Sequence, residues 1–157
     1  MKKRILCMLF TILFSIVGVM QFDVTSYAAV ESEDIDISCV MTEDAITGYA
    51  NNMTWGVYLA SGTSTINKIS SSKVGAGGTT NASIKCSVSI TSILERKNSS
   101  GSWERVISWT EDNTNSFYAV ISKSVTVPSG YYYRVRSYHY AGTDTASSHT
   151  NALWVGN

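Results

Sequence analysis

From residue 82 onward, apolar and polar side chains alternate with a period of two, and no other feature restricts the fold as strongly. One parity carries the apolar residues Ile84, Cys86, Val88, Ile90 and Leu94. The other parity carries serine, lysine and threonine. Because successive side chains of a strand point to opposite faces, the pattern predicts a long strand with one buried face, toward which Cys86 points.

Further segments with the same period predict six to eight strands in all. Their approximate ranges are 34–41, 57–59, 66–74, 103–109, 117–127, 131–141 and 152–154. In the segment 103–109, Trp103 and Trp109 share one parity. In the segment 117–127, Phe117 has the parity of the apolar residues. The predicted class is therefore all-β, an antiparallel β-sandwich, with helical periodicity confined to residues 5–20.

Loops or turns are expected between these strands, where glycine, asparagine, serine or proline gather. They fall at residues 43–54, 75–80, 97–102, 111–116 and 128–130, and Ser61-Gly62 ends the 57–59 strand. The run Gly75-Ala76-Gly77-Gly78 lacks the Lys-Ser pair and the helix of a phosphate-binding loop, so it is interpreted as a flexible turn.

The first 28 residues have the layout of a signal peptide. Lys2, Lys3 and Arg4 precede the uncharged residues 5–20, and Ala28 supplies a small side chain for cleavage. We expect residues 1–28 to form an N-terminal signal helix that is removed, and residues 29–157 to form one secreted β-sandwich domain without a permanent membrane span. A membrane anchor is the alternative, although residues 5–20 fall short of the roughly 20 residues that a spanning helix needs.

The charge balance argues against a nucleic-acid partner. Twelve basic residues balance twelve acidic ones, and charged residues make up only 15% of the chain. Removing residues 1–28 takes away three basic residues and Asp23, which leaves nine basic and eleven acidic residues. The mature chain is therefore nearly neutral.

Residues 127–136 resemble the strand entry of fibronectin type III and related immunoglobulin-like domains. Val127 is followed by a turn that ends at Gly130, and Tyr133 comes three residues later. In those domains this pattern forms a tyrosine corner, whose phenol hydrogen-bonds to upstream backbone. The resemblance implies an immunoglobulin/fibronectin III-like sandwich with Tyr133 at the corner. The alternative is that Tyr133 is one aromatic residue of an ordinary strand.

A second resemblance covers most of the mature chain. After the leader come Gly56-Val57-Tyr58-Leu59, Ser61-Gly62, Gly78-Thr79-Thr80-Asn81-Ala82, Leu94-Glu95-Arg96, Gly101-Ser102-Trp103 and Gly130-Tyr131-Tyr132-Tyr133-Arg134-Val135. This set is similar to a family of small secreted proteins of unknown function from Gram-positive, Clostridia-like bacteria. The resemblance implies secretion and a β-rich fold, and it transfers no active site.

Two cysteines, Cys39 and Cys86, remain after removal of the leader, and both have inward parity. Because disulfides persist outside the cell, we predict that these two residues form one. The alternative is that both are buried thiols that serve as small apolar side chains.

No motif points to catalysis, a cofactor or a metal. His139 and His149 have no carboxylate or cysteine at metal-ligand spacing, so a site would have to assemble from Asp144 or distant side chains. A Gly-x-Ser-x-Gly motif is lacking, and acidic residues such as Glu95 and Glu104 sit at hairpin ends, where solvation explains them. We expect no enzyme, no cofactor and no metal, with a small hydrolase as the remaining catalytic alternative.

The candidate binding surface is a strip on the outward parity of the 131–141 strand. Its residues are Tyr132, Arg134, Arg136, Tyr138 and Tyr140. Rings and guanidinium groups of this kind can bind a glycan or an envelope protein, although stacking of arginine on tyrosine within the sheet explains the same residues. We predict a secreted, non-catalytic binding module at or near the cell envelope. The alternative is a structural, self-associating or effector protein with a protein partner.

Overall fold

The computed structural model describes residues 32–34, 45–50 and 56–157, and every regular element within them is a strand. The strands are β1 (Ser32–Asp34), β2 (Ile46–Tyr49), β3 (Leu59–Ser70), β4 (Lys73–Lys97), β5 (Trp103–Thr126), β6 (Tyr131–Ala141), β7 (Asp144–His149) and β8 (Leu153–Val155). The described residues contain no helix that could cross a membrane. The predicted signal helix at residues 1–28 lies outside them.

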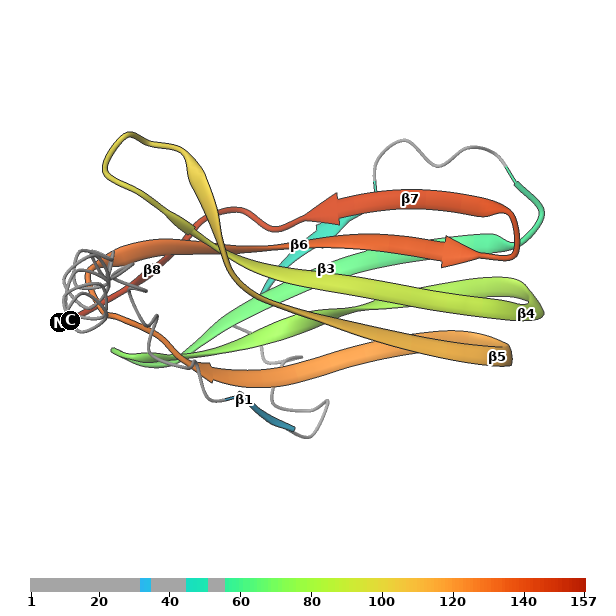
Figure 1. The fold of residues 1–157 in the computed structure, drawn as a ribbon, viewed down its shortest axis with the longest axis horizontal. Coiled ribbons are helices and arrows are strands. Elements are labelled where there is room, and N and C mark those ends of the chain that lie inside the picture. Colours follow the sequence, from blue (N-terminus) through green and yellow to red (C-terminus); the bar gives the residue numbers. More distant parts are fainter. Residues whose placement is uncertain (1–31, 35–44, 51–55) are drawn as a thin grey trace, which may run out of the picture.

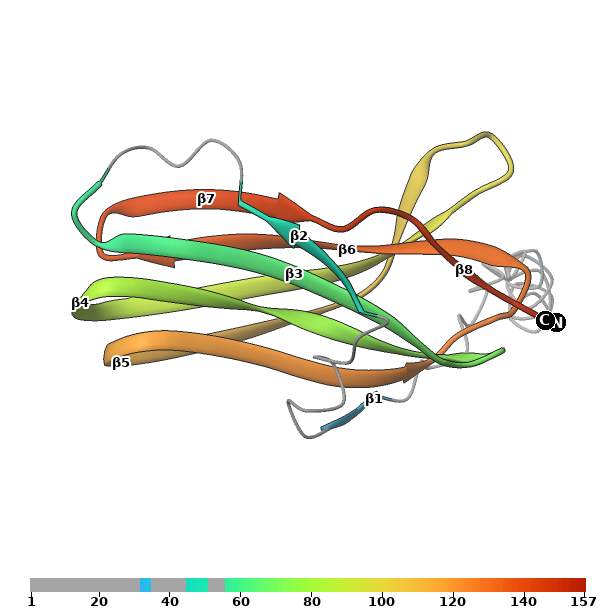
Figure 2. The same ribbon diagram turned by 180° about the vertical axis from the view of Figure 1, so that it is seen from behind.

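β4 and β5 form one long hairpin that folds back on itself, as Figures 1 and 2 show. The first part of β4, up to Asn81, pairs with β3 and with the second part of β5. From Val88 onward, β4 pairs with β6 and with the first part of β5. The two halves of the sheet therefore face each other, and the core lies between them.

The all-β, antiparallel class is confirmed, whereas the immunoglobulin-like sandwich is not. All eight strands belong to one sheet, because β4 and β5 run through both halves. At the edges that lie away from β4 and β5, β2 of one half packs beside β7 of the other half. Gly48 of β2 lies so close to this strand that an added Cβ would stand 1.8 Å from the carbonyl oxygen of His149. The sheet is therefore nearly closed on itself.

The hairpin folds back where the register between its strands is irregular. The pairing shifts between Asn81 and Cys86 and again before Val88, and Asn115 has a positive φ of 52°. The predicted loop at 111–116 is wrong, since β5 runs through it. The inward direction predicted for Ile84 and Phe117 is also wrong. Both are 47% exposed, and both lie where the strands pass from one half of the sheet to the other.

The predicted flexible turn at residues 75–80 is wrong as well. This segment lies inside β4, between β3 and β5, and residues 74–78 are all buried. Its glycines permit close approach of neighbouring strands. A Cβ on Gly77 would stand 1.9 Å from the Ile121 carbonyl oxygen, and one on Gly78 would stand 2.2 Å from that of Thr63. Likewise, β3 continues through Ser61-Gly62 to Ser70.

Two apolar clusters fill the space between the halves. The cluster nearer the hairpin tip contains Ile66, Val74, Ala76, Leu94, Val125, Val127, Tyr133, Val135 and Val155. The cluster nearer the bend contains Leu59, Ala82, Val88, Ile90, Ala119, Ile121 and Ala141. Trp109 packs against both clusters, and along β4 the buried Ser92 lies between Ile90 of one and Leu94 of the other. The middle of the core is therefore polar.

We predict that Gly77→Ala lowers the free energy of unfolding by about 3 kcal/mol or more, because the new methyl group would overlap a backbone oxygen of β5. Gly101→Ala is the matched control. Gly101 has room for a Cβ but a φ of +85°, so its replacement is expected to cost roughly 1–2 kcal/mol. Urea unfolding of both variants measures the difference. A Gly77→Ala variant no less stable than Gly101→Ala would contradict the packing described for β4.

Candidate functional site

β6 places the five residues of the predicted strip on its outer face. Tyr132 and Tyr140 are 47% and 45% exposed, and the other three are half-buried. The alternate residues Tyr133, Val135, Ser137 and His139 are buried in the core. The period of two therefore holds from Tyr132 onward, whereas Tyr131, which has the parity of Tyr133, is 40% exposed.

The two arginines of the strip bind the same carboxylate, Glu95 of β4. Arg134 Nε donates to Glu95 Oε2 at 2.7 Å, and Arg136 Nη2 donates to Glu95 Oε1. Glu95 is only 2% exposed, so the expectation that it is a solvated residue at a hairpin end is wrong. A carboxylate removed from water needs such partners. The two arginines are therefore held in place by a residue of the neighbouring strand.

Aromatic rings complete this arrangement. The Arg134 guanidinium lies 4.3 Å from the centre of the Trp103 ring, and that of Arg136 lies 5.7 Å from the Tyr138 ring. The middle of the strip thus consists of arginines stacked within the sheet, as in the alternative that requires no ligand. The prediction that Trp103 and Trp109 lie on the same face of their strand is wrong. Leu94 pairs with Ile107 but Glu95 pairs with Arg105, so Val106 is an extra residue that reverses the alternation.

The Tyr132 end of the strip is open and joins residues that sequence reasoning missed. Tyr132 pairs with Trp154 of β8, and their ring centres lie 5.0 Å apart at an interplanar angle of 59°. Trp154 and Tyr131 are 43% and 40% exposed. A solvent-open hollow of about 260 Å³ is lined by Lys97, Asn98, Ser99, Gly130, Tyr131, Tyr132 and Trp154. We call it the aromatic hollow.

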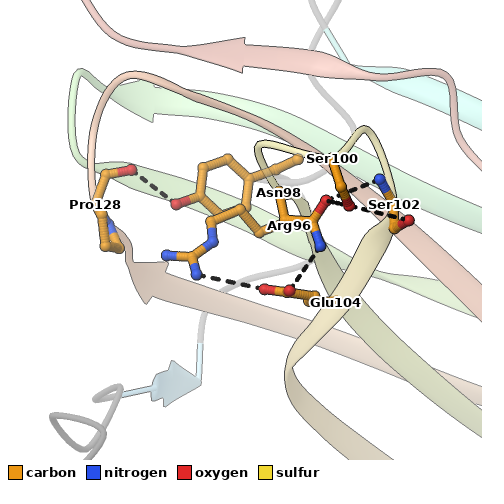
Figure 3. Close-up of polar contacts among 7 residues, drawn as sticks. Arg96, Asn98, Ser100, Ser102, Glu104 and Pro128 are labelled. Atoms are coloured by element: carbon orange, nitrogen blue, oxygen red, sulfur yellow. Dashed lines mark hydrogen bonds and ion pairs between the residues drawn. The ribbon is translucent and has the colours of Figure 1, made fainter.

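Hydrogen bonds from one side chain stiffen the hairpin tip beside the hollow (Figure 3). Asn98 Oδ1 accepts from Ser100 Oγ at 2.7 Å and from the Ser102 amide at 2.8 Å. Asn98 Nδ2 donates to Glu104 Oε1 at 2.7 Å, and Glu104 also lies 3.6 Å from Arg96. The predicted loop at 97–102 is therefore present as a closed turn between β4 and β5.

The opposite rim of the hollow is set by Tyr133. Its buried hydroxyl donates to the Pro128 carbonyl at 2.7 Å, the kind of hydrogen bond that a tyrosine corner makes. Burial raises the pKa of this phenol. Gly130, with a φ of +85°, donates its amide to the Val155 carbonyl. These bonds attach the turn at 128–130 to β8.

A chain of buried hydroxyl groups and one histidine crosses the core. Ser137 Oγ lies 2.9 Å from both Ser92 Oγ and Ser64 Oγ, and Ser64 Oγ lies 2.6 Å from Ser148 Oγ. His139 Nε2 lies 2.8 Å from Ser148 Oγ. The chain joins β3, β4, β6 and β7, so it connects the two halves of the sheet.

The far nitrogen of His139, Nδ1, lies 2.8 Å from Thr80 Oγ1. Thr80 Oγ1 also donates to the Ser89 carbonyl at 3.1 Å, so this hydroxyl group links the ring to the backbone of β4. A neutral imidazole has one N–H donor and one nitrogen acceptor for its two hydroxyl partners, whereas a second proton would remove that acceptor. His139 is fully buried, and this burial lowers its pKa from 6.5 to about 4. The buried imidazole is therefore neutral near pH 7.

The other residues considered for chemistry do not join this chain. Asp144 is buried, and its Oδ2 accepts the amides of Tyr58 and Leu59 at 2.8 and 3.0 Å, which lowers the pKa of the carboxyl group. His149 is exposed. Within residues 45–50 and 56–157, no His, Cys, Asp and Glu residues form a group of three or more that could hold a metal ion.

Cys86 is half-buried, packs against the cluster near the bend and forms no disulfide within the described residues. Its predicted partner, Cys39, lies outside the described residues. The pairing therefore stays a prediction.

We predict that acid destabilises the protein through His139. A histidine with a lowered folded pKa binds fewer protons than the unfolded chain does, so the free energy of unfolding falls as pH drops from 6.5 toward 4. From pH 7.5 to pH 4.5 the loss amounts to about 2–3 kcal/mol. Urea unfolding of wild type and His139→Gln at both pH values measures it. An equally large loss in His139→Gln would contradict this role.

We predict that Glu95→Gln lowers the free energy of unfolding by about 2 kcal/mol, because it leaves two neighbouring guanidinium groups without their carboxylate. The value lies below that of a fully buried pair because Arg134 and Arg136 are partly exposed. Glu104→Gln is the control, with an expected loss below about 1 kcal/mol, since that carboxylate is 51% exposed. Equal losses in the two variants would contradict the contrast between the buried and the exposed pair.

Comparison with known proteins places the chain in a family without assigning an activity. Residues 30–154 match the family described as "Family of unknown function (DUF6147)", and the chain belongs to this family. No curated protein and no solved structure matches the chain.

Proposed function

We propose that this member of the family is an exported, non-catalytic protein that binds a polysaccharide of the cell envelope in the aromatic hollow. The supporting observation is the group of rings around the hollow. Tyr131, Tyr132 and Trp154 are 40–47% exposed although each belongs to a strand of the sheet. Exposed aromatic groups with polar neighbours are typical of recognition surfaces.

The chemistry of the lining suits a sugar. A sugar ring has an apolar face that packs on an aromatic ring and hydroxyl groups at its edge that need hydrogen-bond partners. Trp154 and Tyr132 supply the rings, and Ser99 supplies a hydroxyl group to the lining. Because Asn98 and Pro128 hold the two rims, little ordering would be needed on binding.

The buried histidine supports a role without catalysis. A general base must reach a substrate proton directly or through one water molecule. His139 is fully buried, and both of its ring nitrogens have hydroxyl partners in the core. Asp144 is likewise committed to backbone amides.

Export is proposed from the leader at residues 1–28, whose charged start and apolar run precede small residues. Outside the cell, a disulfide between Cys39 and Cys86 would tie the segment before β2 to the bend of the hairpin. The half-buried position of Cys86 leaves its thiol accessible to such a partner.

A protein partner is the second candidate, and it is favoured by a different surface. Val57, Ile84, Phe117 and Tyr118 are 47–68% exposed. The Ser83 amide donates to the Tyr58 carbonyl and Asn81 pairs with Tyr118, so these residues gather at the bend. We call this group the bend surface. In Figure 1 the bend of β4 and β5 lies at the opposite end of the molecule from β8, whose Trp154 lines the aromatic hollow.

We predict that Trp154→Ala weakens binding to a soluble polysaccharide fraction of the cell envelope at least about tenfold, since it removes a stacking ring worth about 1.4 kcal/mol or more. Isothermal titration calorimetry with the purified mature protein measures the affinity. Tyr140→Ala is the control, because Tyr140 has similar exposure on the same face of β6 but lies far from the hollow. Equal weakening by both variants, or binding lost only on mutation of the bend surface, would argue against the hollow.

A further inference from the structure

We infer that the polysaccharide bound in the aromatic hollow is acidic, with carboxylate or phosphate groups that contact Lys97. This inference rests on the proposed function and names the class of ligand. Three observations lead to it: the local excess of positive charge, the pairing state of each charged group and the position of Lys97 beside the rings.

Positive charge is concentrated at the hairpin end of the protein. The segments 95–105 and 131–136 contain five basic residues, Arg96, Lys97, Arg105, Arg134 and Arg136, against two acidic ones, Glu95 and Glu104. The mature chain as a whole has nine basic and eleven acidic residues. The hairpin end is therefore positive in a protein whose overall charge is slightly negative.

Five of the seven acidic residues that the structure describes lie outside the segments 95–105 and 131–136. Six of the eleven fall within residues 31–44. Of these, Glu33 and Asp34 belong to β1, whose backbone pairs with Ser124 and Lys123 in the second part of β5. That part of β5 belongs to the other half of the sheet from the outer face of β6.

The local carboxylates do not neutralise the cations around the hollow. Arg134 and Arg136 share Glu95, so the three groups together keep one positive charge. Arg96 lies 3.6 Å from Glu104 in a pair whose side chains are 30% and 51% exposed, a weak interaction in water. No carboxylate lines the hollow itself, and Lys97 makes no ion pair within the part of the chain that the structure describes.

The geometry brings this charge next to the stacking surface. Lys97 ends β4 and lines the hollow with Tyr132 and Trp154. The Arg96 guanidinium lies 4.7 Å from the centre of the Tyr131 ring, which adds positive potential to the same wall. A sugar stacked on the rings would therefore place an acidic substituent within reach of a flexible ammonium group, which binds carboxylate or phosphate as a point charge.

A single-stranded nucleic acid has both rings and negative charge, but the hollow suits it less well. Proteins that bind single strands use a groove with successive aromatic platforms along the backbone. Here one tilted ring pair, Tyr132 and Trp154, borders a hollow of about 260 Å³. The leader also directs the expected location to the outside of the cell.

The test compares a charged and a neutral form of one polysaccharide, with poly(glycerol phosphate) and an oligothymidine as further ligands. Calorimetry at low salt compares the mature protein with polygalacturonate fragments and with the same fragments fully methyl-esterified, which are neutral. Poly(glycerol phosphate) forms a third arm that separates phosphate from carboxylate. We expect at least one acidic polymer to bind about tenfold or more tightly than the neutral fragments, and this preference to shrink as salt is raised.

Two lysine variants assign the charge effect. Lys97→Gln is expected to remove most of the preference for the acidic polymer, whereas Lys85→Gln should leave it unchanged, because Lys85 lies at the bend against Phe117. Circular dichroism and urea unfolding check that both variants remain folded.

The outcomes separate the two proposals. Equal binding of acidic and neutral fragments, unaffected by Lys97→Gln, would overturn the inference and leave the sugar-binding function standing. Absence of binding to every polysaccharide would overturn both. Tighter binding of an oligothymidine than of any polysaccharide would overturn the inference in favour of nucleic acid.

Discussion

The fold depends on polar contacts between the two halves of a single folded hairpin. Because β4 and β5 pass through both halves, the inner faces of the sheet must meet, and small hydroxylated side chains let them approach closely at the centre. Ser64, Ser137, Ser148 and His139 then supply each other's hydrogen-bond partners across the gap. A buried hydroxyl group without a partner would cost about 1–3 kcal/mol, so a shift in register would be penalised at several positions at once.

On the outer face of β6, too, polar side chains bind other residues of the same sheet. Glu95 is buried under two arginines, and these in turn stack on Trp103 and Tyr138. The charged groups in the middle of β6 are therefore engaged with residues of the sheet itself. At the Tyr132 end this pattern stops, and the rings around the aromatic hollow have an exposed side. The proposed site rests on this contrast between the middle of β6 and its Tyr132 end.

Sequence periodicity predicted the fold best where one strand has one continuous inner face. Along 131–141 it placed Tyr133 inside and Tyr132 outside, because β6 has no bulge. It failed where the backbone departs from regular pleating. The extra residue Val106 reversed the faces of Trp103, and the bend left Ile84 and Phe117 uncovered. Short-range patterns contain no information about these events.

The candidate site was predictable only in part for a related reason. Tyr132 stood out by its parity, but its partner Trp154 depends on the pairing of β6 with β8, and Lys97 depends on where the hairpin turns. Glu95 looked like a solvated hairpin residue because its two arginines are about forty positions away in the chain. The glycines of 75–78 were taken for a turn because their composition is the same in a turn and in a tightly packed strand.

Backbone and indole chemical-shift mapping by NMR tests the assignment of the site most directly. On titration of the labelled mature protein with an acidic oligosaccharide, the account predicts shifts confined to residues 97–99, 130–132 and the Trp154 indole, with Ile84 and Phe117 unmoved. Shifts centred on residues 81–88 and 113–118 instead, or none at saturating ligand, would contradict it.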